Sequence, residues 1–183
     1  MKTLLASLVL AFVAAIAPAS AQQSNDPANT LVIEVKGGPV VIRLRPDLAP
    51  KHVERVKQLA RDKFYDGVKF HRVIAGFMAQ TGDPTGTGTG KSKYPNLPAE
   101  FTQTPFTRGT VGAARSNDPN SANSQFFICF APTSHLNGQY TVWGQVVEGM
   151  EHIDALKKGA PGSGEVSNPD VMQKVYILGD VKR

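Results

Sequence analysis

Eight short segments rich in β-branched and aromatic residues run through the sequence, and Gly, Pro or Asn bounds each of them. They are residues 31–35, 39–45, 68–74, 77–82, 109–114, 124–131, 140–147 and 173–181. Such residues favour extended strands, and the bounding residues favour turns. Gly37-Gly38, between the first two segments, predicts a β-hairpin. So many short strands in one small domain predict a mainly β fold, either a sandwich or a closed barrel.

Two further stretches have the three- and four-residue apolar spacing of an amphipathic helix. The longer one is expected to begin at Pro50, which suits a first helical turn, and to end at Asp66-Gly67. Its apolar stripe consists of Val53, Val56, Ala60 and Phe64. The shorter one carries Met150, Ile153 and Leu156 on one face and is expected to end before Gly159. Two helices suit the open ends of a barrel, whereas residues 160–169 are expected to form a loop.

The first 21 residues have the pattern of a cleaved secretory signal. Lys2 gives a positive start, residues 4–16 are almost wholly apolar, and Ala19-Ser20-Ala21 fits the small residues required by signal peptidase. Pro18 interrupts the apolar run before it reaches the roughly 20 residues of a membrane span, so no membrane anchor is expected. The sequence therefore predicts export to the periplasm or cell exterior, with residues 22–183 as one mature domain.

Composition argues against several classes of function. The net charge is +5, but lysines and arginines are scattered, so no nucleic-acid-binding surface is expected. Cys129 is the only cysteine, which rules out an intrachain disulfide, and its apolar neighbours predict a buried, unreactive thiol. There is no G-x-S-x-G motif, and the four histidines fit no metal-ligand spacing. We therefore expect neither a metal nor an organic cofactor.

The glycine-rich stretch GDPTGTGTGKS, residues 82–92, resembles a phosphate-binding loop only superficially. A P-loop requires a glycine five residues before Gly90, and Thr85 occupies that position. Pro95 and Pro98 follow, and they disfavour the helix that would have to begin behind the loop. The sequence therefore predicts a flexible surface loop and not a nucleotide site.

Three longer motifs carry a family resemblance. FHRVIAGFMAQTGDP (70–84), PNSANSQFFI (119–128) and HLNGQYTVWGQVVEGM (135–150) occur in the order and approximate spacing found in cyclophilins, the peptidyl-prolyl cis-trans isomerases. The resemblance covers nearly the whole mature chain. It implies an eight-stranded antiparallel closed barrel capped by two α-helices, and a monomer that binds proline-containing peptides and assists the folding of unfolded exported proteins. It also places the glycine-rich loop beside the proline pocket, where glycines allow close approach of a peptide backbone.

The resemblance also implies a set of site residues. Arg72 is the catalytic donor, and Gln80 and Gln125 are amides near the substrate carbonyls and the arginine. The proline pocket is implied to consist of Phe77, Met78, Phe127 and Leu136, with Ala114, Arg115, His135 and Tyr140 around it. Strand alternation supports part of this set, because Gln125 and Phe127 share one face, as do Met78 and Gln80. Phe77 must then lie at an irregular strand start after Gly76, and Phe126 and Ile128 are expected in the core.

The sequence departs from the family pattern at three positions. Ala113 stands where the family commonly has Met, and the missing methionine is expected to loosen the pocket wall. The resemblance implies that Ala114 and Arg115 contact the substrate through their backbone. His135 stands where many members have Trp, so weak or no cyclosporin binding is expected. Tyr140 stands where many eukaryotic members have His, and it still offers an aromatic edge and a hydroxyl.

The chemistry of proline isomerisation explains why few special residues are needed. Rotation about an amide bond has a barrier of about 18 to 20 kcal/mol because the bond is conjugated. The twisted transition state returns a lone pair to the proline nitrogen, and a donor aimed at that nitrogen binds the twisted form selectively. The rigid, always charged guanidinium of Arg72 suits this role. The ordinary alternative is a surface arginine in an ion pair.

Two other functions remain open from the sequence. A proline-peptide-binding chaperone or adaptor would use the same pocket without important turnover, and it would not need Arg72. A small-ligand barrel of the lipocalin type would need a hollow interior, whereas the bulky strand residues indicate a filled one.

Overall fold

The computed structural model describes residues 26–182. The predicted signal at 1–21 and the expected mature start at Gln22 lie outside the described residues. In the part that is described, no helix combines the length and the apolar character needed to cross a membrane.

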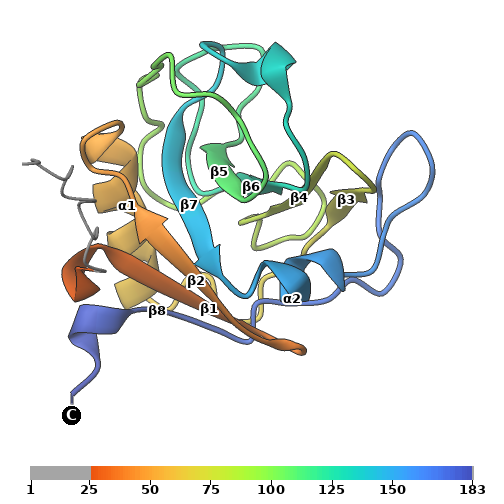
Figure 1. The fold of residues 1–183 in the computed structure, drawn as a ribbon, viewed down its shortest axis with the longest axis horizontal. Coiled ribbons are helices and arrows are strands. Elements are labelled where there is room, and N and C mark those ends of the chain that lie inside the picture. Colours follow the sequence, from red (N-terminus) through yellow and green to blue (C-terminus); the bar gives the residue numbers. More distant parts are fainter. Residues whose placement is uncertain (1–25, 183) are drawn as a thin grey trace, which may run out of the picture.

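One curled, eight-stranded antiparallel sheet is the framework of the structure (Figure 1), with the strand order β3-β4-β6-β5-β7-β2-β1-β8. The strands are β1 (Thr30–Val35), β2 (Gly38–Leu44), β3 (Arg72–Ile74), β4 (Met78–Thr81), β5 (Thr110–Ala113), β6 (Phe126–Cys129), β7 (Val142–Glu148) and β8 (Lys174–Ile177). The helices are α1 (Pro50–Arg61) and α2 (Met150–Asp154), and three short 3₁₀ helices span Pro27–Asn29, Ser134–Leu136 and Leu178–Asp180. The predicted mainly β architecture with two α-helices is confirmed.

The prediction of a closed barrel is wrong, because β3 and β8 are the two edges of the sheet and do not pair as strands. The outer edge of β3 instead bonds to an irregular segment. Val73 N donates to Gly164 O at 2.7 Å, and Gly159 N donates to Val73 O at 2.8 Å. The segment that could have continued the sheet is the predicted loop 160–169, where Pro161 and Gly162 disfavour a regular strand. A loop therefore fills the gap that an eighth pairing, between β3 and β8, would have closed.

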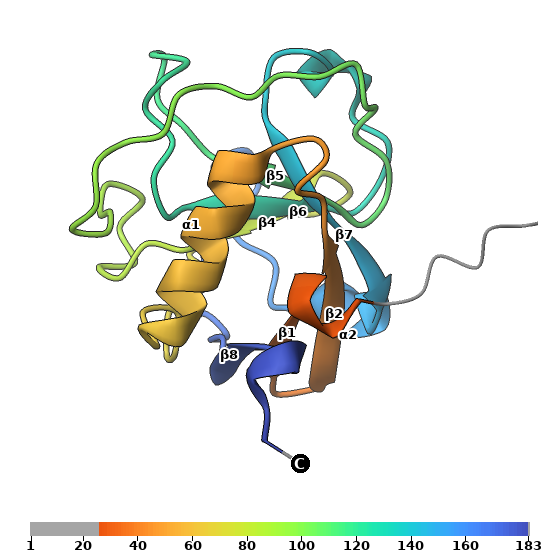
Figure 2. The ribbon, with the colours of Figure 1, turned by 90° about the vertical axis from the view of Figure 1, so that its left-hand side faces the viewer.

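Aromatic side chains fill the interior of the curled sheet. The rings of Tyr65 and Trp143 both pack edge-on against Phe126, with centroids 5.6 and 5.3 Å apart. The core helix residues Val53, Leu59 and Ile153 belong to the same buried cluster. Helix α1 packs against β7 and β8, and α2 packs against β2 (Figure 2). This packing contradicts the hollow interior that a lipocalin-type function would require.

Two local expectations needed correction. The hairpin turn is Lys36-Gly37, since Gly38 already pairs with Val35 as the first residue of β2. Helix α1 ends at Arg61, five residues before the predicted stop, because Lys63 adopts a left-handed conformation with φ 54°. Phe64 N then bonds Leu59 O at 2.9 Å, which is the pattern of a Schellman helix end. Glycine usually occupies the position of Lys63, so this helix end could not be predicted from the sequence.

Candidate active site

A pocket of about 120 Å³ opens on the outer face of the sheet. Its lining consists of Arg72, Phe77, Met78, Gln80, Ala114, Arg115, Phe127, Leu136 and Tyr140. The structure thus brings together nine of the side chains selected from the sequence. Of the other two, Gln125 bonds to Gln80, and His135 is an exposed residue whose ring lies 5.5 Å from that of Phe77.

Strand alternation explains how apolar residues reach an outer face. In β6, Phe126 and Ile128 point into the main core, whereas Phe127 and Cys129 join a second cluster on the opposite face. Met78 of β4 belongs to this second cluster, and β4 pairs directly with β6. We call Phe77, Met78, Phe127 and Leu136 the apolar wall of the pocket. The predicted division of β6 between core and pocket is confirmed.

Phe77 reaches the pocket from a turn, as expected. Gly76 has φ 72°, a conformation that glycine adopts without strain, and Phe77 N donates to Ile74 O at 3.0 Å. The carbonyl of Phe77 accepts from Phe130 N at 2.8 Å. The turn between β3 and β4 is therefore fixed at both ends, and Phe77 lies just ahead of the regular strand.

The guanidinium of Arg72 lies at the polar edge of the pocket and is held by neutral acceptors. Its Nε donates to Ser163 O at 3.0 Å, and its Nη1 donates to Gln80 Oε1 at 3.3 Å. Among residues 26–182, no carboxylate lies within ion-pair distance of it. The alternative of an ordinary surface ion pair is therefore wrong for the described part of the chain. Within residues 26–182 these two bonds leave the other N–H groups of the guanidinium available to a bound peptide.

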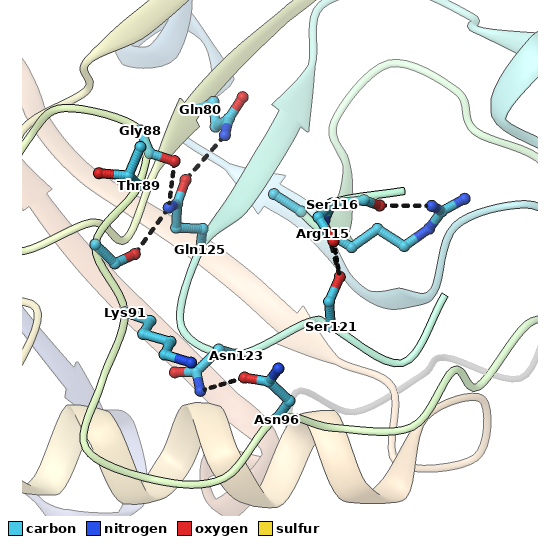
Figure 3. A pocket seen from close by; sticks show the side chains of 12 residues that line it. Gln80, Gly88, Thr89, Lys91, Asn96, Arg115, Ser116, Ser121, Asn123 and Gln125 are labelled. Carbon is cyan, nitrogen blue, oxygen red and sulfur yellow. Dashed lines mark hydrogen bonds between the residues drawn. The ribbon is translucent and has the colours of Figure 1, made fainter. Parts of the chain in front are cut away.

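The two glutamines extend this contact into a chain of hydrogen bonds (Figure 3). Gln80 Nε2 donates to Gln125 Oε1 at 3.0 Å. Gln125 Nε2 in turn donates to the carbonyls of Gly88 and Gly90, at 3.0 and 2.9 Å. Each amide accepts at oxygen and donates at nitrogen, so the orientation of each group fixes the next. We call Arg72, Gln80 and Gln125 the polar relay.

The glycine-rich loop folds around the side chain of its own residue Asp83. The Asp83 side chain is completely buried and accepts hydrogen bonds from the loop. Burial alone would raise the pKa of Asp83, but the hydrogen bonds from Thr85, Gly90 and Gly88 outweigh it and hold this pKa far below its ordinary value. The sequence pattern of the loop did not predict this buried carboxylate.

Arg115 contributes more than the backbone contact expected of it. The Ala114 N–H donates to Gln125 O at 3.0 Å within the chain, and the backbone contacts of Ala114 and Arg115 with a substrate stay predictions. The guanidinium of Arg115, however, lies 4.4 Å from the centre of the Tyr140 ring and donates to Gln139 O at 2.9 Å. Tyr140 packs edge-on against Phe127 at 5.8 Å. The side chain of Arg115 thus supports one side of the pocket.

Sequence reasoning also missed two residues beneath the pocket. The buried ring of Phe106 stacks on Phe127, with centroids 5.6 Å apart. Gly112 of β5 gives these rings room, since a Cβ there would lie 2.6 Å from Phe127 and 2.7 Å from Phe106. A glycine inside a strand pattern indicates such a close approach and could have been recognised. Nothing in the sequence around Phe106 signals its position.

A larger polar groove of about 450 Å³ adjoins the pocket (Figure 3). It shares Gln80, Ala114 and Arg115 with the pocket, and its far side is lined by Lys91, Asn96 and Asn123.

Buried Cys129 lies beneath the apolar wall with its Sγ 3.4 Å from Thr133 Oγ1, and burial raises the pKa of its thiol. The predicted buried thiol is confirmed. Residues 26–182 contain no group of three or more His, Cys, Asp or Glu side chains that could hold a metal ion.

Comparisons with known proteins agree with this geometry. The family model for cyclophilin type peptidyl-prolyl cis-trans isomerases matches residues 30–178. A probable peptidyl-prolyl cis-trans isomerase of Brucella suis is 52% identical over 189 residues, covering 97% of this chain and 95% of that one. Peptidyl-prolyl cis-trans isomerase B of Bacillus subtilis is 39% identical over 145 residues, covering 78% of this chain and 93% of that one.

Two solved structures are also similar. A cyclophilin from Hirschia baltica superposes with a TM-score of 0.78 at 28% identity, covering 86% of this chain and 76% of that one. A cyclophilin type isomerase from Cryptosporidium parvum, crystallised in the presence of the dipeptide Ala-Pro, gives a TM-score of 0.75 at 27% identity, covering 81% of this chain and 98% of that one.

Proposed function

The chain belongs to the cyclophilin type peptidyl-prolyl cis-trans isomerases, and from this premise we propose that Arg72 is its catalytic residue and that its clients are exported proteins. The observation that carries the first part is the position of the guanidinium. It borders an apolar pocket that can hold a proline ring, and only neutral acceptors bind it among the described residues.

The pocket and the arginine have different tasks in this mechanism. The apolar wall binds the proline ring in planar and twisted forms alike, so it contributes binding that is common to both states. The guanidinium donates to the proline nitrogen, which regains its lone pair only when the peptide bond twists. Because Gln80 and Ser163 already fix the guanidinium, little reorganisation is needed during the reaction. No covalent bond breaks and no proton is transferred.

A protease-coupled assay on a short Xaa-Pro peptide tests the role of Arg72. We expect Arg72→Ala to lower kcat/KM by about 10²- to 10³-fold, the scale of losing one preorganised donor. Arg72→Lys should recover only a small part, since a flexible ammonium cannot reproduce the rigid fork. If Arg72→Ala retains full turnover, the catalytic role is wrong. If the wild-type chain binds the peptide without turnover, the binding-module alternative holds.

The proposed clients follow from the pattern of residues 1–21. Cleavage after Ala21 would deliver the domain to the periplasm, where newly exported chains contain unfolded Xaa-Pro bonds. Mass spectrometry of the protein from fractionated host cells should find Gln22 as its first residue in the periplasmic fraction. An intact Met1 in the cytosolic fraction would contradict export and leave the isomerase activity unaffected.

A further inference from the structure

The loop after β4 wraps around a single carboxylate. Asp83 Oδ1 accepts from Thr85 N at 2.7 Å, and Asp83 Oδ2 accepts from the backbone N–H groups of Thr87, Gly88 and Gly90 at 3.1, 2.6 and 3.0 Å. The Thr85 hydroxyl adds a further bond of 2.7 Å to Oδ1. Asp83 is completely buried, and a Cβ at Gly90 would overlap its Oδ1. The loop is therefore built closely around its own internal anion.

The same glycines that bind this carboxylate also bind the polar relay. Gly88 and Gly90 donate their N–H groups to Asp83 and accept from Gln125 Nε2 with their carbonyls. No helix or strand includes residues 82–90. The Asp83 carboxylate thus accepts the backbone hydrogen bonds that a helix or strand would otherwise satisfy. It does so in the segment whose carbonyls bind Gln125.

We propose that Asp83 is a positioning residue for catalysis, which acts on Arg72 through the glycine carbonyls, Gln125 and Gln80. The proposal rests on the catalytic role proposed for Arg72. Two carbonyls directed at Gln125 allow only its nitrogen to face the loop, so its oxygen must face Gln80. The nitrogen of Gln80 is then fixed toward Gln125 and its oxygen toward Arg72 Nη1. If the loop shifts, Gln125 loses its two carbonyl partners, and the orientations of Gln80 and Arg72 are no longer fixed.

The loss of this order should affect the rate more than binding. Asp83 is not among the residues that line the pocket, and the apolar wall holds the proline ring whether or not the loop is fixed. Misplacing a catalytic group by about 1 Å from a distance can cost about 10²-fold in rate. Asp83 is four hydrogen bonds away from the guanidinium, so its substitution is expected to cost less than that of Arg72 itself.

The test is a double-mutant cycle with Asp83→Asn and Gln125→Ala, read as kcat/KM and as affinity for an Ala-Pro peptide. Asn keeps the shape of Asp but turns one acceptor into a donor that faces backbone N–H groups. We expect Asp83→Asn alone to lower kcat/KM about tenfold with affinity changed less than about twofold, and to add little in the Gln125→Ala background. Asp66→Asn is the matched control, because Asp66 Oδ1 accepts a backbone bond of 2.8 Å from Val175 without touching the relay.

Several outcomes overturn the proposal. Equal losses from Asp83→Asn in both backgrounds would mean that Asp83 only stabilises the loop. An unchanged kcat/KM in folded Asp83→Asn would mean that the relay does not depend on it. Should Asp83→Asn not fold, Thr85→Val decides, since it removes the hydroxyl bond to Asp83 Oδ1 at a residue that does not bind Gln125, and its loss of kcat/KM must likewise disappear in the Gln125→Ala background. If Arg72→Ala keeps full activity, the proposed function itself fails. If Arg72→Ala loses activity and Asp83→Asn does not, only the role of Asp83 fails.

Discussion

The apolar wall and the polar relay border the same pocket, but different forces hold them. Phe127 and Met78 are side chains of regular strands, and Phe106 packs behind Phe127. Arg72 lies on a strand of three residues, and its orientation depends on hydrogen bonds that end in an irregular loop. One side of the site is therefore fixed by packing and the other by directional bonds.

This difference separates what each side can contribute to catalysis. Packing is non-directional, so the apolar wall binds proline in every state of the peptide bond. Hydrogen bonds are directional, and a donor held at a fixed angle can distinguish the twisted nitrogen from the planar one. Changes in the wall should therefore lower affinity and kcat/KM together, whereas changes in the relay should lower kcat/KM with little change in affinity.

The largest expected effect comes from removing the centre of the wall. Phe127→Ala deletes the ring that stacks on Phe106 and meets the edge of Tyr140. We expect it to lower the free energy of unfolding by about 3 to 5 kcal/mol. Peptide affinity and kcat/KM should fall by similar factors, because planar and twisted proline lose the same contact. Urea denaturation and peptide titration measure the two effects, and an unchanged affinity would break the comparison.

Extending the wall should sharpen the comparison in the opposite sense. His135 borders the pocket beside Phe77, and we expect the wild type to bind cyclosporin weakly. His135→Trp should tighten binding about tenfold, since the added apolar area contributes about 25 cal/mol per Å². The relay is untouched, so isomerase turnover should stay the same. Calorimetric titration of both proteins tests this, and equal affinities would show that residue 135 is not part of the binding surface.

Lowering the pH should affect the carboxylates of Glu100 and Asp83 differently. Burial alone would raise the pKa of Glu100, but hydrogen bonds from the His52 ring and from the backbone of Lys51 and His52 lower it below 4.5. A lowered pKa adds stability above pH 4.5 that is lost as the pH falls through the folded-state pKa. Burial also lowers the pKa of His52, so its protonation acts in the same direction.

The pKa of Asp83 lies far below its ordinary value, so this carboxylate should stay charged and keep the relay intact between pH 5 and 3.5. We expect the free energy of unfolding to drop by about 1 kcal/mol between pH 5 and 3.5 while activity per folded molecule is maintained. Glu100→Gln should remove the part of this drop that comes from the carboxylate. Urea titrations and assays over this pH range measure both quantities. If activity falls at a higher pH than the free energy of unfolding does, the effect does not come from Glu100 and His52, and the prediction is wrong.

The smallest expected effect lies outside both regions and serves as a control. Lys63 holds a left-handed conformation at the end of α1. Lys63→Gly should relieve its steric cost and raise the free energy of unfolding by about 0.5 to 1 kcal/mol. Its kcat/KM should equal that of the wild type. A changed kcat/KM in this variant would show that global stability alone alters turnover.

The wall was more predictable from the sequence than the relay's support. Period-two alternation divided Phe127 from Phe126 and Ile128, and the family resemblance supplied Arg72, Gln80 and Gln125. These assignments depend on residue types and spacing, which the sequence displays directly. Glycines after β4 were recognised as a loop, but the buried carboxylate that orders them was not, because an Asp in a turn usually faces solvent.

Long-range geometry explains the other errors. Whether a curled sheet closes depends on how its two edge strands meet, and no local pattern records that β3 bonds to residues 159–166 instead of β8. Phe106 reaches the pocket through the irregular segment 82–109, so no periodicity predicts its stacking on Phe127. The sequence was informative wherever a regular element determines the direction of a side chain.

The most direct test of the division between wall and relay compares Arg72→Ala with Phe127→Ala on one Ala-Pro peptide. NMR magnetisation transfer gives the catalysed exchange rate, and titration of the same samples gives the affinity. We expect Arg72→Ala to slow exchange about 10²- to 10³-fold while the dissociation constant changes less than about threefold. Phe127→Ala should lower the affinity and the exchange rate at subsaturating peptide by similar factors. Equal and small losses of rate and affinity in Arg72→Ala would contradict the account, because the arginine would then only help to hold the peptide.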